Sequence, residues 1–523
     1  MQAATRNFLL FCGCLAFHLA GTWALPLVDR DEPRFAEASR EMIERGDFVV
    51  PYFNNRYRFD KPPFTYWAQV ASFRIFGENA FAARFPSAVA AALTAVVIAS
   101  WGARLRDSTR VLPPSPAAAS SSLPRGETRA RSAAVRGLWA AIVFTLCLQT
   151  FVHAKAAVAD MWLVLFMTIA HWAGWELVRD RFGGSWRSAV VRPTGLGGWW
   201  RLFYLALAFA FLAKGPIGWM PLGTVIVYRC MHPLPGFARR FLFVRGTILM
   251  LALVALWGVP ALLRSNGEFL AVGLGRHVVG RSFGTMQGHG GGSILAAIAT
   301  LPFYFVTIFI TFAPWSVKLP WLTRRLWRKR DPLDLYLIAG IGVVVLIFSL
   351  VKTKLPHYIL PAFPLLSLLL VRHWFAVTAE RTLRAWSIAT AAVMLAIALI
   401  GFPLIAPSFP SAALFKKARP YLQPQMDFAA YDFDAPSLVW VFRCRVRGFL
   451  HYNREHNRDV ATLQPDQIVP FLASPGPHFV VLPSELAARL YPTLPNDYRK
   501  FSTHGFDIAK GRWVDLTLIL KNT

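Results

Sequence analysis

Long apolar runs recur along most of this chain and are separated by short polar stretches. A transmembrane helix needs about 20 consecutive apolar residues. The runs that approach or reach this length are 7–28, 81–103, 137–154, 158–178, 199–213, 216–231, 246–264, 294–316, 334–351, 357–371 and 386–405. The sequence therefore predicts an α-helical multi-pass membrane protein with about 11 transmembrane helices, in a range of about 11 to 13.

The composition also indicates a membrane environment. Charged residues make up 16% of the chain and hydrophobic residues 55%, whereas soluble domains contain about 25% charged residues. The first run can also be read as a signal peptide. Its length, its single basic residue (Arg6) and the lack of a small-residue cleavage motif before Asp29 favour an uncleaved helix.

Basic residues gather in alternate connections between the runs. The basic connections are 104–136, 179–198, 232–245, 317–333 and 372–385. An excess of Lys and Arg marks the cytoplasmic side of a membrane protein, so we predict a cytoplasmic N-terminus. The formal net charge of +28 then reflects topology. Nucleic-acid binding would instead require a basic face on one soluble domain.

This orientation places the remaining segments on the outer side. They are 29–80, a short turn around 214, 265–293, 352–357 and the polar tail. We therefore predict two domains, a membrane domain over 1–405 and a soluble outer α/β domain over 406–523. In the tail, β-branched and aromatic residues predict strands, and one segment is typical of a short helix. The strands are Ser437–Phe442, His478–Leu482 and Trp513–Leu520, and the helix is Ser484–Leu490.

The first outer segment, 29–80, contains two predicted helices. The first covers 33–45, with a proline in its first turn and Gly46 at its end. The second starts at the Pro62–Pro63 pair and ends near Gly77. Each helix has apolar residues along one face, which is typical of helices that lie in the membrane interface.

Charged residues converge where these two helices begin. They are Asp29, Asp31, Glu32, Arg34, Asp60 and Lys61. Carboxylates favour helix N-termini on structural grounds alone. The density of charge beside a membrane nevertheless indicates chemistry. A carboxylate can deprotonate a sugar hydroxyl, and a lysine beside a helix N-terminus can bind a phosphate.

Several motifs in the outer segments together resemble one enzyme family. They are D-E-P-R-F-A-E-x-x-R-E-M at 31–42, D-K-P-P at 60–63, A-V-A-D at 157–160, L-A-K-G-P at 212–216, the Arg/His stretch 276–289 and K-T-K-L-P-H-Y-I-L-P at 352–361. This set resembles the superfamily of the lipid A aminoarabinose transferases and protein O-mannosyltransferases. Its members are class C glycosyltransferases, which take a sugar from a polyprenyl monophosphate. The likeness covers most of the predicted membrane domain.

The resemblance implies a role for individual residues. Asp31 would be the general base for the acceptor hydroxyl, and Arg34 and Asp160 would organise its pocket. The carrier phosphate would be surrounded by Lys61, Lys214, Arg281 and Tyr358.

The resemblance also implies a divalent metal ion. Asp60 would hold it together with His277 or, less favourably, His289. The aminoarabinose transferases usually have Glu where this chain has Asp60, which is one methylene shorter. No other cofactor is expected.

The implied reaction transfers a sugar from polyprenyl (undecaprenyl) phosphate to lipid A or another cell-envelope acceptor. It would occur at the periplasmic face of a bacterial inner membrane, with 265–293 as a mobile periplasmic loop that closes over the phosphate. Because phosphate is a good leaving group, one carboxylate suffices where glycoside hydrolysis needs two. A single displacement predicts inversion. The expected partners are the carrier-linked donor, a lipid or glycan acceptor and membrane lipids, but not nucleic acid.

Structural roles remain open for several of these residues. Lys214 can extend to the membrane surface as a snorkelling lysine, and Lys155 can be the partner of Asp160. Tyr358 also fits an interfacial aromatic belt. The stretch 276–292 can be a flexible connector.

Other functions remain as alternatives. A membrane transporter or flippase of a polyprenyl-linked sugar would need ionisable groups near the middle of the bilayer, and the predicted spans are nearly free of charge. An oligosaccharide ligase or lipid phosphatase would act on the same side of the membrane. Detection of polyprenyl monophosphate rather than diphosphate as the product would distinguish a class C glycosyltransferase from these enzymes.

Overall fold

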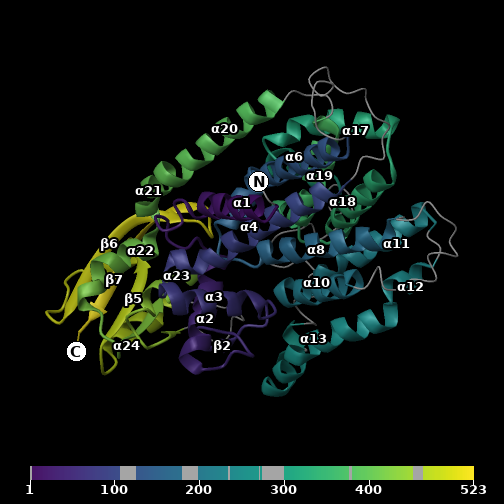
Figure 1. Ribbon diagram of the computed structural model, residues 1–523. Helices are drawn as coiled ribbons and strands as arrows, with labels where there is room; N and C mark the ends of the chain where they lie inside the picture. Colours follow the sequence, from purple (N-terminus) through teal and green to yellow (C-terminus); the bar gives the residue numbers. More distant parts are fainter. Residues whose placement is uncertain are drawn as a thin grey trace.

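The computed structural model describes residues 3–105, 125–179, 198–233, 236–269, 271–273, 300–375, 380–451 and 463–522. A bundle of helices forms one part of the molecule, and a mixed sheet covered by short helices forms the other (Figure 1). The helices α2 (Asp31–Arg45) and α3 (Phe64–Phe76) lie between these two parts.

The helices of the bundle come from both halves of the chain. They are α1 (Ala3–Leu19), α4 (Ala80–Arg104), α6 (Arg125–Thr145), α7 (Leu148–Ala154), α8 (Asp160–Val178), α10 (Trp199–Lys214), α11 (Met220–Met231), α12 (Phe237–Phe241), α13 (Phe243–Arg264), α16 (Phe303–Thr311), α17 (Leu319–Arg328), α18 (Pro332–Leu350), α19 (Phe363–Trp374), α20 (Glu380–Ala396) and α21 (Phe402–Ile405).

Five segments of the described chain are long and apolar enough to cross a membrane. They are Ala80–Arg104, Asp160–Val178, Phe237–Arg264, Pro332–Leu350 and Glu380–Ser408. The bent pair α6 and α7 is a sixth candidate. The predicted α-helical membrane class is thus confirmed, whereas the count of about 11 spans stays a prediction.

The prediction for the first apolar run, 7–28, is wrong at its C-terminal side. The helix α1 ends at Leu19, and Gly21 then adopts a left-handed backbone with φ of 76°. This conformation is open to glycine and interrupts a right-handed helix. The segment that follows α1 therefore approaches α2 without helical structure.

The predicted span 137–154 is not one straight helix. The chain bends by 70° between α6 and α7. After the bend, the Leu148 amide donates a hydrogen bond of 2.9 Å to the Ala313 carbonyl. This contact satisfies an amide at the start of α7 that has no partner within the helix.

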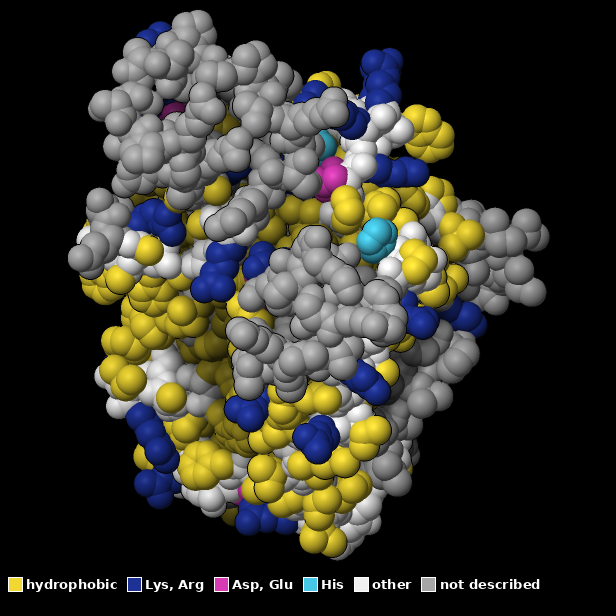
Figure 2. All heavy atoms as spheres, turned by 45° about the vertical axis from the view of Figure 1, so that its right-hand side comes forward, with side chains coloured by type: hydrophobic (Ala, Val, Ile, Leu, Met, Phe, Trp, Pro, Cys, Tyr) yellow, Lys and Arg dark blue, Asp and Glu magenta, His cyan; other side chains and the backbone are white. Residues whose placement is uncertain are grey.

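Apolar side chains remain exposed on the outer helices of the bundle. On α13 these include Ile248, Leu256 and Leu263, and on the segment that begins with α20 they include Ile388 and Leu404. Figure 2 shows hydrophobic side chains over much of the described surface on one face, with few acidic side chains among them. Such a surface suits contact with lipid.

A five-stranded sheet lies in the C-terminal part of the chain, in the order β4-β3-β5-β7-β6. Its strands are β3 (Asp427–Ala430), β4 (Leu450–His451), β5 (His478–Pro483), β6 (Tyr498–Asp507) and β7 (Arg512–Lys521). The strand β3 pairs in parallel with β4 and β5, while β7 pairs antiparallel with β5 and β6. The helices that accompany it are α22 (Pro410–Ala418), α23 (Pro436–Phe442), α24 (Pro465–Ala473) and α25 (Ser484–Leu490).

The strand β5 is buried on both faces of this sheet. Phe479 and Val481 pack into the core formed with α22 and α23, whereas Val480 and Leu482 pack into the core formed with α24 and α25. This alternation follows from the two-residue period of a strand. The predicted strands at His478–Leu482 and Trp513–Leu520 and the predicted helix at Ser484–Leu490 are therefore confirmed.

The predicted strand at Ser437–Phe442 is wrong, because this segment forms the helix α23. Pro436 occupies the first turn, where a proline loses no helical hydrogen bond. Leu438 and Val439 pack toward the sheet, and Trp440 packs on Phe73 of α3. Because α23 is buried between the two parts of the molecule, it needs apolar side chains on several of its sides.

The two predicted helices of 29–80 are present with small shifts at their ends. The helix α2 begins at Asp31 and ends before Gly46, whose φ is 64°, and α3 ends before Gly77. Between them lies a short hairpin of β1 (Tyr52–Phe53) and β2 (Arg56–Tyr57). Four of the eight charged residues of α2 (Glu32, Glu37, Arg40 and Glu41) are buried together with most of its apolar residues.

Candidate active site

The centre of the candidate site is an ion pair between two helices of the bundle. Asp160 is the first residue of α8, and Lys214 is the last residue of α10. The Lys214 ammonium donates a hydrogen bond of 2.6 Å to Asp160 Oδ1, and both side chains are about nine-tenths buried. Lys155 is not the partner of Asp160, because its ammonium donates instead to the backbone carbonyls of Phe17, His18 and Ala20.

Two histidines complete this buried cluster. His153 lies near the end of α7, and His357 lies in a 3-10 helix over Pro356–Ala362. Their rings are 4.7 Å apart, and His357 Nε2 lies 4.0 Å from Asp160 Oδ1. Sequence reasoning did not select either histidine. Both nevertheless lie in or beside quoted motifs, because His153 precedes A-V-A-D and His357 precedes Tyr358.

Three acids at the start of α2 have different environments. The Glu32 carboxylate is buried against the Arg84 guanidinium, at 2.6 Å, and accepts a hydrogen bond from the Ala157 amide. Asp29 accepts hydrogen bonds from the backbone and the hydroxyl of Ser437. The side chain of Asp31, by contrast, is 66% exposed. Two of the acids therefore fix the local structure, and Asp31 is the one that is accessible to a substrate.

Asp31 is held near the buried cluster. Arg34, one turn further along α2, places Nη1 3.8 Å from Asp31 Oδ1. Asp31 also interacts electrostatically with His153. The predicted acceptor side of the site thus has Asp31 and Arg34 at its surface and Asp160 below them in the bundle.

The predicted phosphate-binding residues gather around His357. Lys61 lies just before α3 and interacts electrostatically with His357. The Lys214 ammonium lies 5.6 Å from the centre of the Tyr358 ring. Lys214 and Tyr358 are therefore neighbours in the fold although they are far apart in the sequence, and Lys61 is close enough to His357 for their charges to interact. Arg281, His277 and His289 lie outside the described residues.

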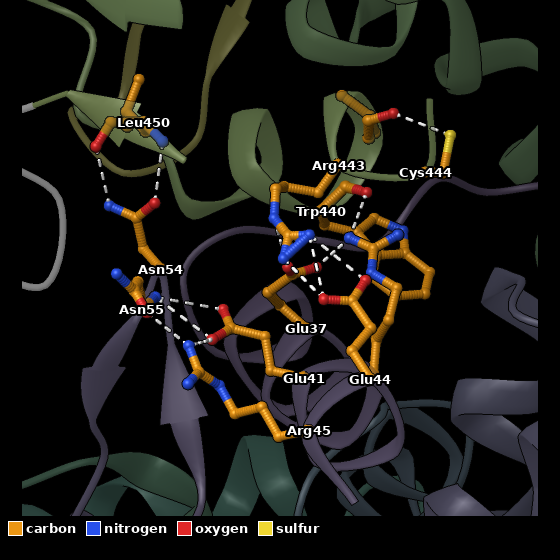
Figure 3. Close-up of polar contacts among 12 residues, drawn as sticks. Glu37, Glu41, Glu44, Arg45, Asn54, Asn55, Trp440, Arg443, Cys444 and Leu450 are labelled. Carbon is orange, nitrogen blue, oxygen red and sulfur yellow. Dashed lines mark hydrogen bonds and ion pairs between the residues drawn. The ribbon is translucent and has the colours of Figure 1, made fainter. Parts of the chain in front are cut away.

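The C-terminal domain holds α2 from its outer side (Figure 3). Arg443 follows α23, and its guanidinium lies 2.6 Å from Glu44 and 3.7 Å from Glu37. The Asn54 side chain forms two hydrogen bonds with the backbone of Leu450, at 2.9 and 3.0 Å. Arg443 thus adds a partner for the buried Glu37 from some 400 residues away in the chain, beside the local partner Arg40.

A second contact joins the C-terminal domain to the segment before α2. Asp29 accepts hydrogen bonds of 2.8 Å from the Ser437 amide and 2.5 Å from its hydroxyl. Burial raises the pKa of Asp29 to about 6, although the two Ser437 bonds and the charge of Arg34 act in the opposite direction. The start and the body of α2 are therefore both attached to the C-terminal domain.

Comparison with known proteins agrees with this arrangement. The family model described as dolichyl-phosphate-mannose-protein mannosyltransferase matches residues 60–113. The undecaprenyl phosphate-alpha-4-amino-4-deoxy-L-arabinose arabinosyl transferase 2 of Sodalis glossinidius is 28% identical over 71% of this chain and 60% of its own length. The corresponding transferase of Aeromonas hydrophila is 28% identical over 72% of this chain and 61% of its own length.

Solved structures show the same fold. The crystal structure of ArnT from Cupriavidus metallidurans bound to undecaprenyl phosphate superposes with a TM-score of 0.70, at 18% identity, over 99% of this chain and 98% of ArnT. Its apo state gives a TM-score of 0.68 at 20% identity. The chain is thus similar in sequence to undecaprenyl phosphate arabinosyl transferases and in fold to ArnT. It spans about three fifths of the length of the arabinosyl transferases that it matches.

The metal site implied by the resemblance does not fit Asp60 well. Arg58 Nη2 lies 3.2 Å from Asp60 Oδ2, and the Arg58 side chain is almost fully buried. A fixed guanidinium neutralises the carboxylate and opposes a second cation beside it. Among the described residues, the group of ligand-type side chains that comes together is His153, Asp160 and His357.

Lys354, in the motif that contains Tyr358, has a local structural role. Its ammonium donates hydrogen bonds to the Ser349 and Val351 carbonyls, at the end of α18. Free carbonyls at a helix C-terminus attract cations through the helix dipole. Lys354 therefore caps α18.

Proposed function

We propose that this chain transfers a sugar from polyprenyl (undecaprenyl) phosphate to lipid A or another cell-envelope acceptor. The names of the arabinosyl transferases that it resembles support a carrier of this kind. The observation that carries the proposal is one accessible acid, Asp31, whose charge acts on the same histidine, His153, as the pair of Asp160 and the cation Lys214. An acceptor hydroxyl and a carrier phosphate need these two kinds of residue side by side.

The reaction is a single displacement. The acceptor hydroxyl oxygen attacks the anomeric carbon while the bond from that carbon to the phosphate oxygen breaks. The phosphate leaves with the electron pair, and the Asp31 carboxylate takes the hydroxyl proton. Attack opposite the leaving group inverts the anomeric carbon.

Positive charge near the leaving group stabilises the departing phosphate. Lys61 and Lys214 supply this charge, and the Tyr358 hydroxyl is a further donor to phosphate oxygens. Groups fixed in a partly buried site act more strongly than the same groups in water. We propose that Arg281, in the loop over 265–293, joins them when the carrier is bound.

Arg34 and Asp160 act through neighbouring residues. Arg34 orients Asp31 from the next turn of α2. Asp160 fixes Lys214 and keeps its charge close to the carrier. Both are positioning residues in the proposed mechanism.

We propose that the site faces the periplasm of a bacterial inner membrane, with the N-terminus in the cytoplasm. The alternation of basic connections along the sequence supports this orientation. In this arrangement the membrane domain 1–405 binds the carrier, and the periplasmic domain 406–523 covers α2 from outside.

Mass spectrometry of the cell-envelope glycolipids tests this function. Deletion of the gene should remove one sugar mass increment from a lipid or glycan, and the wild-type chain should restore it. The Asp31→Asn variant, expressed at the same level, should not restore it. The purified protein should release polyprenyl monophosphate. An unchanged glycolipid profile together with release of polyprenyl diphosphate would contradict the proposal.

A further inference from the structure

We propose that His153, Asp160 and His357 form a binding site for one divalent metal ion of the Zn²⁺ type. Each residue offers one ligand atom, and these atoms lie within 4.8 Å of one another. Two imidazoles and one carboxylate make a donor set that suits zinc and is poorly matched to Mg²⁺, which prefers oxygen ligands.

The geometry requires only a small adjustment. Zinc lies about 2.0–2.2 Å from nitrogen and oxygen ligands, so two ligands on one tetrahedral ion are about 3.4 Å apart. His357 Nε2 and Asp160 Oδ1 are 4.0 Å apart. The separations must therefore shorten by about 0.6 Å for this pair and by about 1.4 Å at most within the group, which side-chain rotation can provide.

The three side chains come from elements that fix their positions. His153 lies on α7, whose first amide is bonded to Ala313, and Asp160 opens α8. His357 lies in a 3-10 helix that packs on α8 and α7. Metal sites depend on such pre-placement, because ordering the ligands otherwise reduces affinity.

Gln149 contacts His153 from the preceding turn of α7. Its side-chain Nε2 lies 2.8 Å from His153 Nδ1, so the amide donates and Nδ1 accepts. Rotation of the amide group by half a turn would place its oxygen there instead; Nδ1 would then carry the proton and Nε2 would offer a lone pair to a metal.

Metal binding requires the Lys214 ammonium to move away from Asp160, which a flexible lysine side chain allows more readily than the planar guanidinium of Arg58 beside Asp60. Lys214 now donates to Asp160 Oδ1 and balances its charge. A divalent ion would replace the ammonium as the counter-charge of Asp160 and leave Lys214 for the carrier phosphate. This last consequence rests on the proposed function, whereas metal binding itself does not.

The proposed site differs from the one that the sequence implies. Asp60 is already paired with the buried guanidinium of Arg58. The cluster around Asp160 instead brings two imidazoles to one carboxylate. The two positions can be separated by substitution, because they share no ligand.

Metal content of the purified full-length chain tests the proposal. The protein in detergent is stripped with a chelator, titrated with ZnCl₂ and passed through gel filtration, and bound zinc is measured by elemental mass spectrometry. Wild type should bind one zinc per chain. His153→Gln and His357→Gln should each weaken binding more than about 10-fold, because each removes one ligand.

Two control variants should bind zinc as wild type does. His504→Gln removes an exposed imidazole from β6, and Asp60→Asn removes the acid of the alternative site. His357→Cys serves as a second variant at the site, since a thiolate also binds zinc, and it should retain binding where His357→Gln loses it. This rescue separates ligand loss from misfolding.

The outcomes are distinguishable from those of the transfer reaction. A wild-type chain without zinc, or retention of zinc by both histidine-to-glutamine variants, would overturn the metal site. Loss of zinc in Asp60→Asn alone would also overturn it. Stoichiometric zinc in a chain that releases no polyprenyl monophosphate from any polyprenyl-phosphate sugar would instead count against the proposed function.

Discussion

Lys214 donates a hydrogen bond of 2.6 Å to Asp160, so the last residue of α10 is fixed to the first residue of α8. The L-A-K-G-P and A-V-A-D motifs, whose charged residues are 54 positions apart, therefore meet at one point. Around this point lie the accessible acid Asp31 and the cation Lys61. Burial of the acid Asp160 beside an apolar run is costly, and Lys214 is the partner that offsets this cost.

Removal of one partner of this pair should destabilise the protein. The change Asp160→Asn leaves the Lys214 ammonium buried without its counter-ion, which typically costs about 3–5 kcal/mol. Thermal unfolding in detergent should therefore occur at a lower temperature. Glu485→Gln breaks an exposed pair on α25 and should have little effect. Equal unfolding temperatures for the two variants would contradict the buried ion pair.

The attachment of α2 to the C-terminal domain should depend on Arg443. Its side chain is 3% exposed and faces the carboxylates of Glu44 and Glu37. Arg443→Met leaves Glu44 without this partner and Glu37 with Arg40 alone, so we expect a loss of about 2–4 kcal/mol of stability and faster proteolysis between the two parts. The transfer rate should fall as well, because Asp31 lies on the same helix.

A matched control for this change is Arg489→Met. Arg489 lies on α25 and is 71% exposed. Limited proteolysis of both variants should cleave Arg443→Met first. If both variants resist cleavage as wild type does, the contacts of Arg443 with α2 do not hold the C-terminal domain in place.

Stability should depend on pH through Asp29. Its pKa is raised from 3.8 to about 6, so between about pH 4 and pH 6 the unfolded chain binds fewer protons than the folded chain at this residue. The contribution of Asp29 to the free energy of unfolding therefore falls as pH rises through this window. Asp29→Asn should remove that fall, as measured by thermal unfolding at a series of pH values.

Ser437→Ala provides the check on this assignment. It removes the hydroxyl that donates to Asp29 and that opposes the rise of the pKa. The pH window should then move upward. A window that stays unchanged in both Asp29→Asn and Ser437→Ala would assign the pH dependence to another group.

Carrier binding should depend on Lys61. Lys61→Met removes one charge-assisted contact to the phosphate, which is worth about 1.5–3 kcal/mol, or roughly 10- to 100-fold in affinity. Binding of radiolabelled polyprenyl phosphate to the purified protein measures this change. Lys500→Met, at an exposed position in β6, should bind the carrier as wild type does. Equal affinities for both variants would remove Lys61 from the phosphate site.

Local structure was largely predictable where turn chemistry or periodicity is strong. Gly46 and Gly77 end α2 and α3 as expected, and the apolar strand β5 and the helix α25 follow from residue pattern. The segment Ser437–Phe442 was not predictable in the same way. It is apolar on several sides because it is buried between two parts of the protein, and such a run looks like a strand.

Long-range partners account for most of the other differences. Arg443, which pairs with Glu37 and Glu44 of α2, lies some 400 residues away in the chain. Lys155 is closer to Asp160 in sequence than Lys214, but the packing of α8 on α10 selects Lys214. The pairing of His153 with His357 likewise depends on tertiary structure alone.

The most direct test of the account is sugar transfer by Asp31→Asn. The variant keeps the size and position of the side chain but cannot take the acceptor proton. With a polyprenyl-phosphate sugar and the acceptor identified by glycolipid profiling, release of polyprenyl monophosphate should fall by at least about 100-fold, while binding of polyprenyl phosphate stays within a few-fold of wild type. Near-normal release of polyprenyl monophosphate by Asp31→Asn would contradict the account.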